Sequence, residues 1–225
     1  MTASWQAADW INHGAELIRS DPFLASQLIR KGVCADPDEP LGWFNFGLAL
    51  HEQRFISQAI RAYRMSLQRP SGHEIALINN LSQDLLLNGS MAEGWTLYEN
   101  RLKKMKRNNI WEQCLGASWN GLDDPRGYPD KLVLVSEQGL GDTIQFSRFG
   151  LQLQRMGFQV ELFSQKSLVK LFQECSDLET IVSAFDPERY RGKVAWVPLM
   201  SLPYRLGCLY APWPYCSEYL RIPSK

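Results

Sequence analysis

The spacing of apolar residues changes near the middle of the chain. Up to about residue 106, apolar side chains recur every three or four positions, which is typical of amphipathic helices. From residue 131 onward, short apolar, β-branched runs alternate with helical segments. Strands that alternate with helices need crossover connections, which favour a parallel sheet. The pattern therefore predicts an α + α/β chain, with helices in residues 1–106 and a sheet domain in residues 131–225.

Six helices are predicted in the first half. Asp21-Pro22 indicates a helix start, because the carboxylate can cap and proline needs no N–H partner in the first turn. The stretch "SMAE" predicts a capping box at the sixth helix, in which Ser90 and Glu93 satisfy each other's backbone donors.

The helices recur as pairs at a repeat spacing. Gly47, Ala59 and Tyr63 are placed so that small residues meet where two helices touch and an aromatic ring fills the next gap. This pattern, clearest from Pro40 to Pro70, resembles the tetratricopeptide repeat (TPR). One such pair cannot bury its apolar face alone, so three stacked pairs are expected.

The repeat resemblance implies a surface that binds a peptide or glycan acceptor. Its polar residues are predicted to be Asn45, Asn79 and Asn80. The aromatic residues Trp43 and Phe46 are instead expected in the core.

The second half predicts one Rossmann-like unit. Residues 107–130 are rich in Asn, Gly, Asp and Pro and are predicted to form a linker with anchoring tryptophans. Strands are predicted at "KLVLVS", "FQVELFS", "LETIVSA" and "KVAWVPLM", with helices from Thr143 to about Met156 and at "SLVKLFQEC".

Ligands of parallel sheets bind at the carboxyl ends of the strands. The residues predicted to bind substrate at that edge are Glu137, Gln138, Gly139, Gly141, Gln165 and Ser201. A dinucleotide fingerprint is incomplete, because Ile144 stands where a third glycine is needed, and no P-loop lysine follows. We therefore expect no bound cofactor and no metal.

The stretch "QGLGD" leaves two roles open for Asp142. The carboxylate can cap the following helix, or it can act as a base beside two glycines that expose backbone N–H groups. The three histidines, His13, His51 and His73, all precede the sheet domain. Proton transfer at this bend therefore falls to Asp142 or Glu137.

Composition narrows the function classes. Lys+Arg and Asp+Glu both number 24, so no basic field favours nucleic acid. No apolar run is long enough to predict a membrane span. The five cysteines are scattered, which indicates free thiols in a reducing cytosol, and we expect a cytoplasmic protein.

Four segments carry a second resemblance. Through "EGWTLYENRL", "SWNGL", "LVLVSEQGLGDTIQFSRF" and "VPLMSLPYRLG", the chain resembles bacterial TPR-containing glycosyltransferases related to the heptosyltransferases. Members pair two Rossmann-like domains, of which the first faces the acceptor and the second binds the nucleotide-sugar. The resemblance implies a metal-independent inverting reaction with Asp142 as the general base.

The family's second domain is expected after "YLRIPSK", where the chain ends at Lys225. The sequence thus predicts the acceptor-side half of a glycosyltransferase, inactive alone: a fragment, a natural truncation, or a chain whose donor domain is supplied by a partner. Residues 209–220 are a candidate docking patch for a missing domain or a second copy, unless their aromatic side chains pack against the sheet. A non-catalytic, protein-binding scaffold that retains a degenerate transferase domain is the alternative. An unrelated nucleotide-binding enzyme is the third reading.

Overall fold

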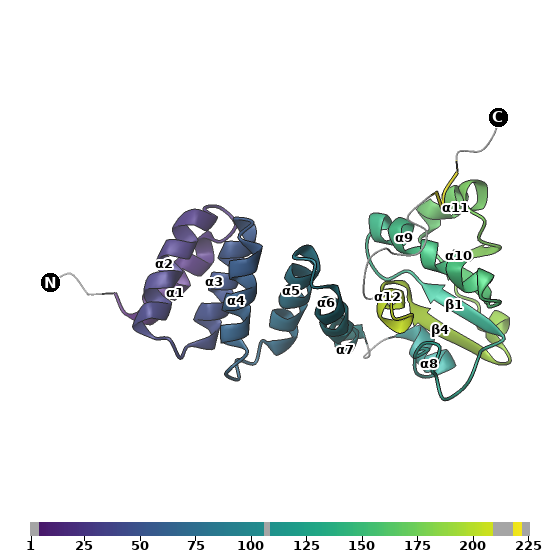
Figure 1. Cartoon of the computed structure of the whole chain (residues 1–225), viewed down its shortest axis with the longest axis horizontal. Coiled ribbons are helices and arrows are strands. Elements are labelled where there is room, and N and C mark those ends of the chain that lie inside the picture. The colour runs from purple at the N-terminus through teal and green to yellow at the C-terminus, as the bar shows by residue number, and fades with distance from the viewer. Residues whose placement is uncertain (1–4, 106–108, 209–217, 222–225) are drawn as a thin grey trace. The chain divides into compact units, whose positions relative to one another are not determined.

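The chain forms two compact units in a computed structural model that describes residues 5–105, 109–208 and 218–221. The first unit is Met1–Lys104 and the second is Met105–Lys225. The first is helical and the second contains a parallel sheet (Figure 1), so the predicted α + α/β class is confirmed.

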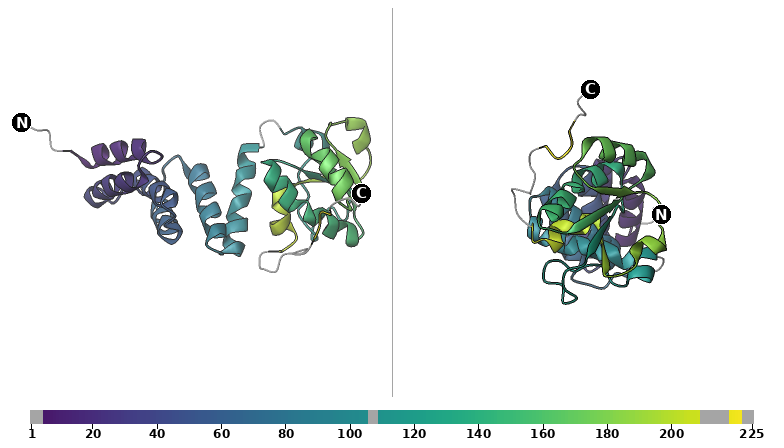
Figure 2. Two further views of the ribbon diagram at one scale, coloured as in Figure 1. Left: turned by 90° about the horizontal axis from the view of Figure 1, so that it is seen from above. Right: turned by 90° about the vertical axis from the view of Figure 1, so that its right-hand side faces the viewer.

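The helical unit consists of three helix pairs. Within each pair the two helices pack closely, and each pair also contacts the next, as the further views in Figure 2 show. The six helices are α1 (Ala7–Leu17), α2 (Pro22–Ala35), α3 (Pro40–Glu52), α4 (Ile56–Ser66), α5 (Glu74–Leu87) and α6 (Met91–Tyr98). The short helices η1 (Glu99–Arg101) and α7 (Leu102–Met105) follow α6.

Glycines allow the paired helices to approach closely. A Cβ added at Gly47 in α3 would lie 2.3 Å from Cε1 of Tyr63 in α4, and one added at Gly94 would lie 2.8 Å from Leu86 Cδ2. Tyr63 is fully buried. The predicted contact of a small residue in one helix with an aromatic ring in the next is therefore confirmed for α3 and α4.

One of the two predicted helix caps is present. Asp21 caps α2, since Leu24 N donates to its Oδ1 at 3.0 Å. The predicted capping box of α6 is wrong: Ser90 is the N-cap residue, but its side chain makes no capping hydrogen bond. Glu93 instead pairs with Arg64 of α4, at 2.8 Å between Nη2 and Oε2. A charged partner on the neighbouring helix has displaced the local cap.

The second unit contains a four-stranded parallel sheet in the order β3-β2-β1-β4. The strands are β1 (Lys131–Val135), β2 (Gln159–Phe163), β3 (Thr180–Val182) and β4 (Val194–Pro198). All four predicted strands are confirmed. The helices of this unit are α8 (Ile110–Leu115), α9 (Leu140–Phe146), α10 (Arg148–Arg155), α11 (Val169–Cys175) and α12 (Leu202–Arg205), and the 3-10 turns are η3 (Lys166–Leu168), η4 (Pro187–Tyr190) and η5 (Leu199–Ser201).

Each face of the sheet is covered by different elements. On one face Gly150 of α10 packs against Leu134 and Val160, where an added Cβ would lie 3.1 Å from Leu134 Cδ1. The other face carries a cluster of aromatic side chains around Trp111 of α8, with Phe163 at 4.9 Å and Tyr190 at 5.2 Å between ring centroids. Because both faces are buried, the strands read as nearly continuous apolar runs.

The segment predicted as a linker packs into the sheet unit. It contains α8, and the side chains of Trp111 and Trp119 are 5% and 1% exposed. Trp119 N donates to Trp196 O at 2.7 Å, so this segment covers the outer edge of β4. The prediction that its tryptophans anchor it is confirmed, whereas the prediction of a separate linker misses this packing.

Two further predictions differ from the structure or lie beyond its description. The helix predicted from Thr143 to about Met156 is divided into α9 and α10 at Ser147, whose hydroxyl donates to Ile144 O at 2.8 Å. The predicted docking segment, residues 209–220, lies outside the described residues except at positions 218–220.

Candidate functional site

The carboxyl edge of the sheet brings the predicted substrate residues together. Neighbouring strands β2, β1 and β4 end side by side. Glu137 and Gln138 follow β1, Gln165 follows β2, and Ser201 follows β4. Residues separated by up to 64 positions along the chain thereby reach one edge.

Hydrogen bonds at this edge join the three strand ends to one another. Met200 N donates to Glu137 Oε1 at 3.2 Å, which connects the ends of β4 and β1. Gln165 Nε2 donates to Gln138 O at 2.7 Å, which connects the ends of β2 and β1. Glu137 and Gln165 therefore hold the bend in place, and part of their hydrogen-bonding capacity is used within the protein.

Asp142 is not the cap of the helix that follows the bend. Helix α9 begins at Leu140, and its N-cap residue is Gly139, which has no side chain to accept a hydrogen bond. Asp142 lies in the first turn of α9 and is half-buried, and its carboxylate makes no hydrogen bond or ion pair among the described residues. Of the two roles left open by the sequence, the structure removes the cap.

The two glycines of the bend are exposed and have no structural need to be glycine. Gly139 has φ −62°, a value that any residue adopts, and a Cβ added to it would lie 3.5 Å from Asp142 Oδ2. A Cβ added to Gly141 would meet nothing within 4 Å. The missing side chains therefore leave the backbone beside Asp142 open to an approaching molecule.

Ser201 does not present its side chain at the surface. It is fully buried at the end of η5. The prediction that Ser201 contacts substrate conflicts with this burial, because a ligand at the edge cannot reach a side chain without exposed area. Its neighbour Met200 is also buried, so η5 packs inward as support for the bend.

The three predicted protein-binding asparagines lie on the first helices of their pairs. Asn45 is in α3, and Asn79 and Asn80 are in α5, all three partly exposed. Asn80 Nδ2 donates to Ala76 O at 2.9 Å within its own helix. Asn79 Oδ1 is buried and has no hydrogen-bond partner in the structure. The asparagine amides are thus only partly available to an acceptor.

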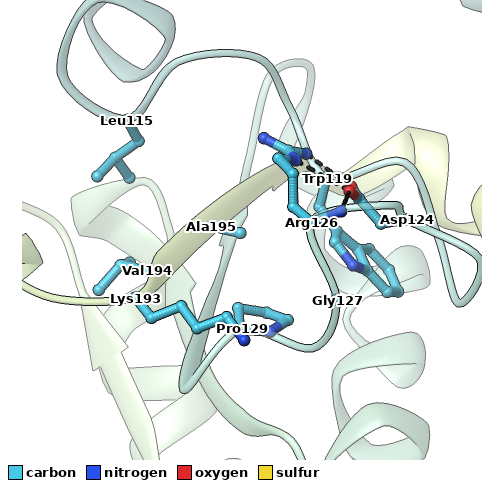
Figure 3. A pocket seen from close by; sticks show the side chains of 9 residues that line it. All are labelled: Leu115, Trp119, Asp124, Arg126, Gly127, Pro129, Lys193, Val194 and Ala195. Atoms are coloured by element: carbon cyan, nitrogen blue, oxygen red, sulfur yellow. Dashed lines mark hydrogen bonds and ion pairs between the residues drawn. The ribbon is translucent and has the colours of Figure 1, made fainter.

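A pocket of about 170 Å³ lies at the opposite, amino edge of the sheet (Figure 3). Its walls include Trp119, Pro129 and Val194, and the Lys193 side chain runs along it. No sequence feature predicted this pocket.

The turn beside the pocket is held by Asp124 and Arg126. Arg126 Nε donates to Asp124 Oδ1 at 2.9 Å, and its Nη1 donates to Ala117 O at 2.7 Å. The hydrogen bond from Arg126 lowers the pKa of Asp124 well below its usual range. In the sequence, the stretch "DDPR" places an acid and a base two positions apart, and this spacing could have predicted the ion pair. Its bonds are all internal, so it stabilises the turn.

Two further buried carboxylates were missed by sequence reasoning. Glu161 of β2 is 1% exposed and accepts from Tyr190 OH at 2.8 Å and from Arg189 Nη2 at 2.9 Å. Asp84 of α5 is fully buried, and its Oδ1 lies 2.6 Å from His51 Nδ1. Burial raises the pKa of Asp84, partly offset by the hydrogen bond to His51. In both cases the partner comes from another element.

Within the described residues no group of three or more His, Cys, Asp or Glu side chains could hold a metal ion. Among the same residues, no helix combines the length and apolar character needed to cross a bilayer.

No family model matches the chain. Protein FlbA of Caulobacter vibrioides is 29% identical over 113 residues, which is 49% of this chain and 18% of FlbA. The matched region is thus a small part of that protein, and the similarity assigns neither a family nor an activity.

Proposed function

We propose that this chain is the acceptor-side half of a TPR-linked, metal-independent inverting glycosyltransferase, with Asp142 as the general base. Two features support the proposal: the resemblance of "EQGLGDTIQFSRF" to that family, and the position of this stretch at the carboxyl edge of a parallel sheet. In this proposal the three helix pairs are TPR units and the sheet unit is the first Rossmann-like domain.

The proposal rests mainly on one observation: the Asp142 carboxylate is available to accept a proton. Of the two carboxylates at the bend, Glu137 accepts a backbone hydrogen bond, whereas Asp142 makes none among the described residues. A general base must keep an oxygen available for the proton that it removes. Asp142 meets that requirement beside two exposed glycines.

The reaction would begin when an acceptor hydroxyl hydrogen-bonds to Asp142. The carboxylate takes the hydroxyl proton as the acceptor oxygen attacks the anomeric carbon. The bond from that carbon to the nucleoside diphosphate breaks, and its electron pair leaves with the diphosphate. Attack from the opposite side inverts the anomeric configuration. Glu137 and Gln165 hold the bend and would thereby keep Asp142 in place. A base held in the correct position raises the reaction rate, because the reacting groups need not be oriented anew.

The test replaces Asp142 by Asn in the full-length product of the natural gene. The amide keeps the size of the side chain but cannot accept the proton. Nucleotide-sugars labelled in the sugar are incubated with the enzyme and an extract of its host, and label in macromolecules is measured. We expect the substitution to lower the rate by about 100-fold or more, as for loss of a general base.

The matched control is Asp123→Asn, an exposed aspartate next to Asp124, whose pocket lies at the opposite edge of the sheet. It should leave the rate unchanged. A full rate in Asp142→Asn would remove the catalytic role. Calorimetry with nucleotide-sugars and the present chain should show no micromolar binding, because the proposal places the donor site in another domain. Micromolar binding would contradict the acceptor-side assignment.

A non-catalytic, protein-binding scaffold is the second candidate. It is favoured by the internal use of the edge residues: Ser201 is fully buried, and the Glu137 and Gln165 side chains bind neighbouring backbone groups. A degenerate transferase domain would retain such a frame without turnover. The absence of any labelled product from the full-length protein, with a normal fold, would favour this candidate.

A further inference from the structure

The second helices of the first two pairs, α2 and α4, enclose a groove. Its volume is about 240 Å³, and α3 lies beneath it with Phe46 and Leu50 among the lining side chains. Gln53 Nε2 donates to Pro22 O and to Ala49 O, both at 2.9 Å. These bonds join the start of α2 to α3, so the base of the groove is already formed.

The two walls of the groove repeat one another. On α2, Phe23 lies one helical turn before Gln27. At the start of α4, Phe55 likewise lies about one turn before Gln58. Helical geometry places residues three or four apart on the same face. Each wall therefore carries a phenylalanine followed by a glutamine.

Both phenylalanines are unusually accessible. Phe23 is 64% exposed and Phe55 is 49% exposed. Arg54, just before Phe55, has φ +65°, a left-handed conformation that is costly for a residue with a side chain. The backbone is therefore strained at the turn that presents Phe55. Neighbouring exposed aromatic side chains are typical of a surface that binds a partner.

The one charged side chain among the described residues that line the groove is a cation, Arg30. Arg30 lines it next to Gln27, and the Arg30 side chain has no hydrogen bond or ion pair among the described residues. The lining residues include no Asp or Glu. Arg61 lies one turn beyond Gln58 on α4 and is likewise unpaired among the described residues. The charge complementary to this groove is negative.

The equivalent space between α4 and α6 is bridged instead. Arg64 of α4 pairs with Glu93 of α6 at 2.8 Å between Nη2 and Oε2. Among the described residues, no side-chain hydrogen bond joins α2 to α4. An ion pair thus joins the second helices of the second and third pairs, whereas no side-chain bond joins those of the first and second pairs among the described residues.

We propose that the groove between α2 and α4 binds an acidic peptide segment of a partner protein. An apolar side chain of the peptide packs between Phe23 and Phe55, and a carboxylate beside it pairs with Arg30. Gln27 and Gln58 hydrogen-bond to the peptide backbone. An aromatic anchor with a charged neighbour is a common arrangement in peptide recognition. Asn45 is not among the residues that line this groove, and the proposed site does not depend on glycosyl transfer.

The test uses two fluorescein-labelled eight-residue peptides with a central phenylalanine, one flanked by glutamates and one by lysines. Fluorescence anisotropy measures their binding to the full chain. We expect the glutamate peptide to bind at least about tenfold more tightly than the lysine peptide, and its affinity to fall with added salt, as for an attraction between unlike charges.

Variants then locate the site. Phe23→Ala and Phe55→Ala should each weaken the glutamate peptide by about fivefold or more, since exposed aromatic anchors contribute to binding. The matched control is Leu87→Ala, an equally exposed apolar residue of α5 (62%). Arg30→Glu should weaken binding more than Lys166→Glu, which makes the same charge change on the sheet unit.

The proposal is overturned by any of four results, of which three concern the peptides. These are no binding of the glutamate peptide at millimolar concentration, equal binding of the two peptides, and full binding by Phe23→Ala, Phe55→Ala and Arg30→Glu. Self-association that disappears in Phe23→Ala, measured by sedimentation, would also overturn it, because the groove would then hold a second copy of the chain. Circular dichroism confirms that each variant is folded.

Discussion

Each unit of the protein contains a nearly inaccessible carboxylate, Glu161 in the sheet unit and Asp84 in the helical unit, and the two differ in their hydrogen-bond partners. Both oxygens of Glu161 in the sheet unit accept hydrogen bonds, from Tyr190 OH and from Arg189 Nη2. In the helical unit, Asp84 bonds to His51 through Oδ1, while its Oδ2 is buried and has no partner in the structure. Their side chains are 1% and 0% exposed, so the difference lies in the partners.

The difference arises because more hydrogen-bonding side chains lie around Glu161 than around Asp84. The turn η4 lies next to Glu161, and the side chains of its last two residues, Arg189 and Tyr190, donate hydrogen bonds to the carboxylate. Lys131 of β1 adds a positive charge 3.8 Å from Glu161 Oε2. Around Asp84, the neighbouring helices use their backbone groups internally, which leaves only side chains such as His51 as partners. A turn therefore satisfies a buried charge more completely than a helix pair does.

Removing the fully paired carboxylate should have the largest effect. Glu161→Ala leaves the buried Tyr190 hydroxyl and the Arg189 guanidinium without their acceptor, and breaking such a pair typically costs about 3 kcal/mol or more. Urea unfolding, read in each unit separately by hydrogen-exchange mass spectrometry, measures the loss. It should be confined to the sheet unit.

The control for this substitution is Glu174→Ala, which removes an exposed ion pair with Lys170 on α11. Exposed pairs contribute about 0.5 kcal/mol or less. If Glu161→Ala were no worse than Glu174→Ala, the buried cluster would not stabilise the sheet unit, and the contrast with Asp84 would fail.

A matched pair of tyrosine substitutions tests the hydroxyls beside the two carboxylates. Tyr190→Phe loses the hydrogen bond to Glu161 and should lower the free energy of unfolding by about 1 to 2 kcal/mol. Tyr63 OH is buried and has no hydrogen-bond partner in the structure. Tyr63→Phe should therefore cost nothing, or stabilise the helical unit by a few tenths of a kcal/mol, within about 0.5 kcal/mol of the original protein.

The pKa values of Tyr63 and Tyr190 reflect the burial of both hydroxyls and the carboxylate beside each one. Burial raises the pKa of Tyr63, and the negative charge of Asp84 raises it further. Burial also raises the pKa of Tyr190, and its hydrogen bond to Glu161 adds to the shift. A loss of more than about 1 kcal/mol in Tyr63→Phe would mean that its hydroxyl is satisfied after all.

The smallest effect is expected in the pH dependence of the helical unit. Burial raises the pKa of Asp84 above its ordinary value of 3.8. A group with a raised pKa in the folded state contributes stability that is complete below the unfolded value and is lost as pH rises through the folded value. The stability of the original protein relative to Asp84→Asn should therefore decline as pH rises above 3.8.

Asp84→Asn keeps an oxygen for His51 but cannot ionise. Thermal unfolding of both proteins between about pH 3 and pH 7 gives the comparison, with unfolding of the helical unit followed by hydrogen exchange. An identical pH profile in the two proteins would show that burial does not disfavour the Asp84 carboxylate. If the original protein instead became more stable relative to Asp84→Asn as pH rises, the assigned sign would be reversed.

Local features were predictable because they depend on neighbouring residues. The cap at Asp21, the six helices and the four strands follow from residues within a few positions of one another. The capping box at Ser90 failed because Arg64, on another helix, binds Glu93. Similarly, Asp142 is not a cap, which was one of its two possible roles, because the helix starts at Leu140, three residues before the predicted start at Thr143.

The candidate site was predicted in its location and not in its bonding. The rule that strands of a parallel sheet end together placed Glu137, Gln165 and Ser201 at one edge. It could not tell that Ser201 is fully buried or that Gln165 binds Gln138 O. These properties depend on the packing of side chains from segments far apart in sequence.

By itself, the sequence determined the change from helix pairs to a parallel sheet, because the two apolar periods reflect backbone geometry at each position. It also determined the residues offered at the carboxyl edge. Tertiary structure alone decided the strand order β3-β2-β1-β4, the pairing of Glu161, and the availability of Asp142. Each of these features depends on which segments, far apart in the sequence, pack against one another. That packing determines which groups are buried and which form hydrogen bonds.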